Sequence, residues 1–134
     1  MALLAVASEN TAIAAVFVPS TTYYLSLHSA TPAQTGTNEI SGGSYARQAI
    51  TFGSASGGSE ASTNSQTFTN LPVEAGGIPY FGIWDAATAG NYKGGGTTTG
   101  LTGSLPAGIS INFAVGAVTV AIACLLYTSP SPRD

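Results

Sequence analysis

The sequence predicts an all-β fold, a single-domain antiparallel β-sandwich of jelly-roll-like or Ig-like type, preceded by a short N-terminal helix. Charged residues make up 7% of the 134 residues, against about 25% in a typical soluble domain. Glycine, serine, threonine and alanine take their place, a composition that favours short strands and tight turns over helices. Apolar and polar residues alternate at Tyr23–His28, and further short strands follow at roughly even spacing with turn signals between them.

Residues 1–18 are rich in alanine and predict a helical segment. Ile13, Val16 and Phe17 share one helical face by their spacing of three and four. Pro19 ends the helix, because the residue before a proline is disfavoured in helical angles. The alternative is a secretory signal peptide with Ala5-Val6-Ala7 as its cleavage site. A positively charged start is missing and the apolar run is short, which disfavours this alternative.

Residues 19–123 are expected to form the sandwich. In the first strand Tyr23, Leu25 and Leu27 share one face, while Tyr24, Ser26 and His28 share the other. Residues 80–84 are apolar on both faces and are expected at the centre of the core. Residues 31–43 read as a long exposed connection, 53–64 as a polar mobile loop and 85–91 as a hairpin loop. The other expected strands are 46–52, one beginning at 66–68, 92–93, 97–105, 109–113 and 117–122.

The last segment, residues 124–134, differs from everything before it. Read back through the genetic code, these residues fit a transposon-type sequencing adapter translated in frame, as found in environmental short-read sequence. The alternative is a natural proline-rich disordered end. On the adapter interpretation the segment is excluded from fold reasoning, Cys124 carries no function, and the natural C-terminus lies past Ala123.

Composition excludes several classes of function. The net charge is -3 and no basic patch occurs, so nucleic-acid binding is not expected. Apolar runs such as residues 12–18 are too short to span a bilayer, so membrane insertion is not expected either. A single cysteine allows neither an internal disulfide nor a cysteine-built zinc site.

Catalytic and cofactor sites are not predicted. His28 is the only histidine and is interpreted as a surface or sheet-face residue beside the following loop. Paired carboxylates of a glycosidase need a rigid support, whereas three of the five carboxylates before residue 124 lie in expected loops, and no calcium-loop spacing occurs. Residues 93–97, Lys-Gly-Gly-Gly-Thr, are not a phosphate loop, because the lysine precedes the glycines and no helix follows. The glycines are expected to permit a bulge or a turn.

Two structural and two surface roles are predicted. Arg47 is nearly alone as a cation, and a buried guanidinium needs acceptors for its five donors. We expect it to pair with Asp85 and so to join the second strand to the loop after Trp84. The alternative is an exposed strand arginine. Tyr24 and Tyr92 are the candidate surface contacts, since an exposed ring can stack on a sugar.

The chain resembles the small phage tail fiber protein family. The resemblance covers roughly residues 10–122. It rests on Tyr23–His28, on Asn38–Phe52, which contains the motif Tyr-Ala-Arg-Gln, and on Phe81–Ala87, which contains the motif Trp-Asp-Ala-Ala. It implies a non-enzymatic structural protein of the virion, a tail fiber or minor tail component. It also implies other phage tail proteins as partners and contact with a host-surface glycan or protein. Low charge and uncapped β edges separately favour a homo-oligomer.

Two competing classes remain at this point. One is a secreted carbohydrate-binding β-sandwich module, for which an exposed coplanar aromatic pair would be the sign. The other is a small hydrolase, which would need His28 or two carboxylates gathered in one pocket.

Overall fold

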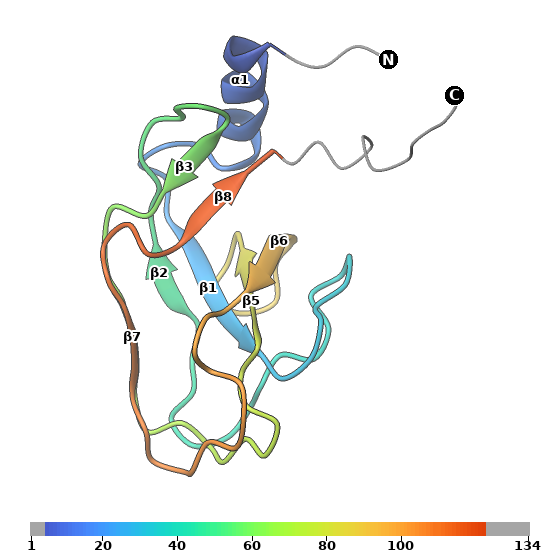
Figure 1. The fold of residues 1–134 in the computed structure, drawn as a ribbon, viewed down its shortest axis with the longest axis vertical. Helices are drawn as coiled ribbons and strands as arrows, with labels where there is room; N and C mark the ends of the chain where they lie inside the picture. Colours follow the sequence, from blue (N-terminus) through green and yellow to red (C-terminus); the bar gives the residue numbers. More distant parts are fainter. Residues whose placement is uncertain (1–4, 123–134) are drawn as a thin grey trace.

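The computed structural model describes residues 5–122, and these form one helix and eight short strands (Figure 1). The one helix among these residues is not long and apolar enough to cross a membrane. Residues 1–4 and the 124–134 segment with Cys124, interpreted above as adapter sequence, lie outside the described residues. The elements are α1 (Val6–Val16), β1 (Tyr23–His28), β2 (Gln48–Ile50), β3 (Ser59–Ala61), β4 (Gln66–Phe68), β5 (Tyr80–Trp84), β6 (Tyr92–Thr97), β7 (Ile111–Phe113) and β8 (Thr119–Ala121).

The main sheet is antiparallel, with four strands in the order β2-β1-β5-β6. β1 pairs with β5 so that Ser26 lies opposite Gly82 and Leu25 opposite Ile83. Because side chains alternate between faces, Tyr23, Leu25 and Leu27 point to one side with Ile83. Ser26 and His28 point to the other side. We call these the apolar face and the polar face of the sheet.

The apolar face forms the core. Leu25, Leu27, Ile50 and Ile83 are fully buried there, and Phe52 and Phe68 pack with them. α1 lies at one end of the molecule next to β3 (Figure 1). The ring of Phe17 meets Tyr23 edge-on at 5.7 Å and Phe52 at 5.5 Å.

A single hydroxyl group fastens the end of the helix to the sheet. Tyr23 donates a hydrogen bond to the Val16 carbonyl (3.1 Å) and accepts one from the Val18 N–H (2.8 Å). Ile13 and Phe17 are buried as expected, but Val16 is 41% exposed, so the apolar stripe of α1 is narrower than its spacing predicts.

The all-β class and the N-terminal helix are confirmed. The second layer consists of two separate two-stranded ribbons, β3-β8 and β4-β7, so the sandwich itself is not confirmed. The expected strand over 97–105 is wrong, because β6 ends at Thr97 and the positive φ angles of Gly100 (77°) and Gly103 (92°) break any continuation. The expected mobile loop over residues 53–64 contains β3. The alternation of apolar and polar residues did not predict this strand, because it is short and polar.

Glu60 is the unexpected residue of β3. It is 2% exposed, and neither of its carboxylate oxygens has a hydrogen-bond partner among the described residues. Burial raises the pKa of this carboxyl above its ordinary value. Serine, glycine and threonine surround Glu60 in the sequence, and this composition predicts a mobile loop. In the structure Glu60 lies in a strand opposite Val120 of β8, and this pairing directs its side chain into the interior.

We predict that Glu60→Gln raises the free energy of unfolding at pH 7 by about 1 kcal/mol, because it removes a buried charge without a partner. The pKa is raised on folding, so the penalty begins as pH rises through the ordinary value of 4.5. The gain should therefore shrink below pH 4.5. Urea unfolding at both pH values measures it, with Glu74→Gln as the control. A loss of stability at pH 7 would mean that the carboxylate has a partner.

Candidate functional site

The guanidinium group of Arg47 sits at the centre of a polar cluster on the polar face. Nε and Nη2 donate to the two oxygens of Glu39 at 3.0 and 2.9 Å. Nη1 donates to the carbonyl oxygens of Ala86 (3.0 Å) and Ala89 (2.8 Å). The guanidinium carbon also lies 3.8 Å from the centre of the Trp84 ring, a cation–π contact. Only 9% of the side chain is exposed. Each of its three nitrogens donates at least one hydrogen bond.

The partner of Arg47 differs from the one expected from sequence. Asp85 accepts hydrogen bonds from the backbone N–H and the side-chain amide of Asn91 (2.7 and 2.8 Å). These bonds hold the pKa of Asp85 below its ordinary value. Asp85 closes its own loop, and Arg47 reaches that loop through main-chain carbonyls instead. The expected tie between the Arg47 segment and the loop after Trp84 exists, but the carboxylate is that of Glu39.

Tyr45 extends the cluster to the backbone of β1. Its hydroxyl donates to Oε2 of Glu39 (2.6 Å) and accepts from the N–H of Leu27 (3.1 Å). Burial and the bond to Glu39 raise the pKa of Tyr45. Burial alone would raise the pKa of Glu39, but the hydrogen bonds from Arg47 and Tyr45 outweigh it and hold that pKa below its ordinary value.

A second chain of hydrogen bonds runs beneath this cluster. Nε1 of Trp84 donates to the Ser26 hydroxyl (2.9 Å), which lies 2.7 Å from Nε2 of His28. Nδ1 of His28 lies 2.7 Å from the Thr37 carbonyl oxygen. Since that oxygen can only accept, Nδ1 carries the hydrogen, and Nε2 accepts from Ser26.

The Ser26–His28 pair has the contact distance of a nucleophile and its base, but a substrate cannot reach it. Both residues are 0% exposed, and the serine oxygen already accepts from an indole. The sheet-face position beside the loop agrees with expectation for His28, whereas a surface position does not. Burial lowers the pKa of this imidazole.

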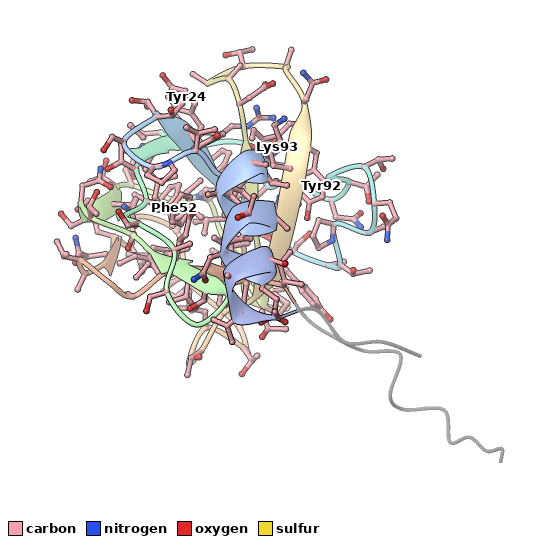
Figure 2. The ribbon with its side chains drawn as sticks, turned by 90° about the horizontal axis from the view of Figure 1, so that it is seen from above. Tyr24, Phe52, Tyr92 and Lys93 are labelled. Carbon is pink, nitrogen blue, oxygen red and sulfur yellow. The ribbon has the colours of Figure 1, made fainter. Side chains whose placement is uncertain are left out.

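A cleft of about 480 Å³ opens beside the polar face, between residues 31–34 and β6. Tyr80 and Tyr92, both half-buried, line it together with Thr31, Gln34 and Lys93. Figure 2 shows Tyr92 on the side of β6 that faces this loop. The Tyr92 ring packs edge-on against Trp84 at 5.3 Å, and burial raises the pKa of its hydroxyl.

Glycine is required where the loop crosses the two rings. Gly36 has a φ of 75°, and a Cβ there would collide with both Trp84 and Tyr92. Tyr24, the other predicted contact, is half-buried opposite Trp84 and is not among the residues that line the cleft. Of the two predicted contact residues, the structure therefore places only Tyr92 in a cleft.

Sequence reasoning missed Glu39, Ser26 and Trp84 as members of one network. A usable signal existed for Glu39: it lies eight residues from Arg47 across the Gly42-Gly43 turn, with Tyr45 between them. No comparable signal marked Ser26, whose partners come from another strand. Among residues 5–122 no group of three or more histidine, cysteine, aspartate or glutamate side chains could hold a metal ion.

We predict that Arg47→Ala lowers the free energy of unfolding by about 3 kcal/mol, because it leaves Glu39 and two carbonyl oxygens without their donors. Lys93→Ala, which removes an exposed cation, should change stability by less than about 0.5 kcal/mol. Chemical unfolding at pH 7 measures both. Equal stabilities for wild type and Arg47→Ala would exclude a structural role for the cluster.

A pH dependence follows from His28. Its pKa is lowered on folding, so the unfolded chain binds the proton more readily. The neutral imidazole therefore contributes stability above its ordinary pKa of 6.5, and this contribution is lost as pH falls below that value. We expect the unfolding midpoint to fall between pH 7 and pH 5, and His28→Gln to flatten this slope. An unchanged slope in the variant would assign the acid sensitivity to another group.

Comparison with known proteins places the chain in a family. The family model described as "Podophage GP4 fiber I protein gp80" matches residues 2–121. Comparison with curated proteins gives no match. The match covers β1, the Arg47 segment and the Trp84 loop, which also carry the resemblance noted from sequence. The chain therefore belongs to the podophage GP4 fiber I protein family and is a structural component of the phage tail fiber.

Proposed function

We propose that this chain is a non-enzymatic, multi-copy fiber subunit that contacts a host-surface saccharide through the cleft between residues 31–34 and β6. The observation that carries the proposal is the wall of that cleft. Two tyrosines of the polar face, Tyr80 and Tyr92, stand beside the amide of Gln34 and the hydroxyl of Thr31. Aromatic faces stack on sugar rings, and hydroxyl and amide groups can bind sugar hydroxyls.

The cleft stands on a rigid frame. Gly36, at the end of the loop that forms one wall, packs against the rings of Trp84 and Tyr92. Thr37, the next residue, accepts the hydrogen bond from His28. Pro32, inside the loop, accepts hydrogen bonds from the N–H groups of Gly36 (2.8 Å) and Thr37 (3.0 Å). A wall held in this way loses little conformational freedom on binding, which favours affinity for a small ligand.

Two observations support a non-enzymatic role. The serine–histidine pair is closed off from solvent, and the carboxylates are dispersed: Glu39 is bound to Arg47, Asp85 closes its own loop, and Glu60 is buried in another sheet. None of these groups lines the cleft. The cleft therefore offers contacts for holding a saccharide and no acid–base pair for cleaving one.

The test is a glycan array probed with the full chain, followed by titration of the best saccharide. Gln34→Ala should weaken binding about tenfold, as expected for the loss of one hydrogen bond. Tyr92→Phe keeps the ring and should bind within a few-fold of wild type. Gln48→Ala is the matched control, because Gln48 carries the same amide outside the cleft and bonds only to the nearby Ala46 carbonyl.

Light scattering on the same sample gives the number of binding sites per particle. We expect a stable trimer or hexamer, which would raise the apparent affinity for a multivalent surface. Equal binding by wild type and Gln34→Ala, or none to any saccharide, would contradict the proposed contact. A monomer at every concentration would contradict the homo-oligomer.

A further inference from the structure

The outer edge of β6 presents main-chain groups that have no partner among residues 5–122. The N–H of Thr98 donates to the Pro79 carbonyl (2.9 Å), so Thr98 faces β5. Successive residues of a strand direct their backbone groups to opposite edges. Gly95 and Thr97 lie opposite Gly82 and Tyr80 and therefore point their N–H and C=O groups away from β5.

β8 has an open edge as well. Val118 accepts from the N–H of Ser62 (2.9 Å), and the N–H of Ile122 donates to Gly58 (3.1 Å). By the same alternation, Thr119 and Ala121 direct their backbone groups away from β3. No hydrogen bond joins these groups to another described residue.

Both edges border one cleft of about 740 Å³ on the apolar side of the sheet. Gly94 and Gly96 face this side. A Cβ at Gly94 would lie 3.8 Å from the Phe17 ring, so the missing side chain leaves space there, whereas the Phe81 ring already lies close to Gly96, 3.1 Å from where a Cβ would stand. Among the described residues that line the cleft, Lys93 is the only charged one, and the apolar ones include Phe17, Phe81, Leu101, Ile111, Phe113 and Val120.

The opposite edge of the same sheet is closed. The side chain of Asn64 lies along β2, donating to the Ala49 carbonyl (3.0 Å) and accepting from the Thr51 N–H (3.0 Å). One amide side chain thus takes the place of a neighbouring strand. Open strand edges invite pairing with another chain, and proteins commonly block them. Within this sheet the β6 edge is therefore the one that is free to pair with another chain.

We propose that an extended segment of a neighbouring tail protein docks in this cleft by strand addition along β6. Its main chain pairs with Gly95 and Thr97, as in β-augmentation. Its alternate side chains are apolar and fill the space beside Gly94, against Phe17 and Phe81. A carboxylate near one end of the segment meets Lys93. This interface goes beyond the proposed saccharide contact. The two clefts share residues 93–97 as a common wall and otherwise lie on opposite sides of β6.

A second copy of this chain does not offer such a segment within its described residues. Its exposed large apolar side chains are all valines, and none of them belongs to a strand: Val6, Val16, Val18, Val73 and Val115. β6 itself has glycines where the cleft needs side chains. Pairing of two β6 edges would leave both clefts unfilled, so the chemistry favours a different polypeptide.

The experiment uses the full chain and a synthetic peptide as long as β6, with valine alternating with threonine and one terminal aspartate. A proline-substituted version of the peptide is the control. Binding is measured by fluorescence anisotropy, and amide exchange at Gly95 and Thr97 by NMR. We expect the peptide to bind and to slow exchange at both amides, and the proline version to do neither.

Variants locate the interface. Thr97→Pro removes an outward N–H, and Thr97→Val keeps it; we expect the first to weaken peptide binding about tenfold and the second to leave it unchanged. Gly94→Ile should fill the cleft and abolish binding without loss of the fold, checked by its unfolding midpoint. Gln34→Ala should bind the peptide normally, which separates this interface from the saccharide contact.

Failure of the peptide to bind would overturn the proposal. So would amides at Gly95 and Thr97 that are already protected without peptide: the cleft would then be filled by a segment of the same chain if the protein is monomeric, or by a second copy if protection rises with oligomer mass.

Discussion

The burial of one guanidinium group organises the polar side of this protein. Only 9% of the Arg47 side chain is exposed, and a charge so placed is tolerated only when most of its donors are matched. Glu39 supplies two acceptors, and the loop after Trp84 supplies two carbonyl oxygens. These partners come from segments that are distant in sequence. The hydrogen bonds of this one side chain therefore hold the connection before β2 and the hairpin after β5 in a fixed position relative to each other.

The same demand explains why both faces of a small sheet are buried. A four-stranded sheet in a chain of this size commonly leaves one face to water. Here the polar face is covered by the long connection after β1, and its buried groups are joined in a chain from Trp84 through Ser26 and His28 to Thr37. Each donor has an acceptor, so the layer is polar without unpaired groups. Among the described residues the exceptions lie in the two ribbons: both carboxylate oxygens of Glu60 in β3 and the amide oxygen of Gln66 in β4 have no partner.

Much of this could be predicted from sequence wherever local rules decide the outcome. The alternation at Tyr23–His28 and the need of Arg47 for acceptors gave correct expectations. The apolar run of Tyr80–Trp84 correctly predicted a strand, but Tyr80 and Phe81 are only half-buried and one face of this strand lies on the polar side of the sheet. The partner of Arg47 was missed because Asp85 and Glu39 are equally charged, and only the three-dimensional path of the chain selects between them. β3 was missed because its strand is specified by pairing with β8, some sixty residues later, and not by its own composition. The cleft beside Tyr92 depends on the loop conformation at Gly36, which the loop composition does not encode in a readable way.

The glycines of β6 lie between the two clefts described above and line both of them. Residues 94–96 carry no side chains, and both clefts reach this strand, one on each side. Gly95 is held as glycine by collision, since a Cβ there would meet the Phe81 carbonyl and the Tyr92 hydroxyl, whereas Gly94 has only an ordinary contact with Phe17. Packing alone thus explains Gly95 and leaves Gly94 without a reason. The fold has room for a larger side chain at Gly94, and a docked strand whose side chains need that space, as proposed above, would account for a glycine there.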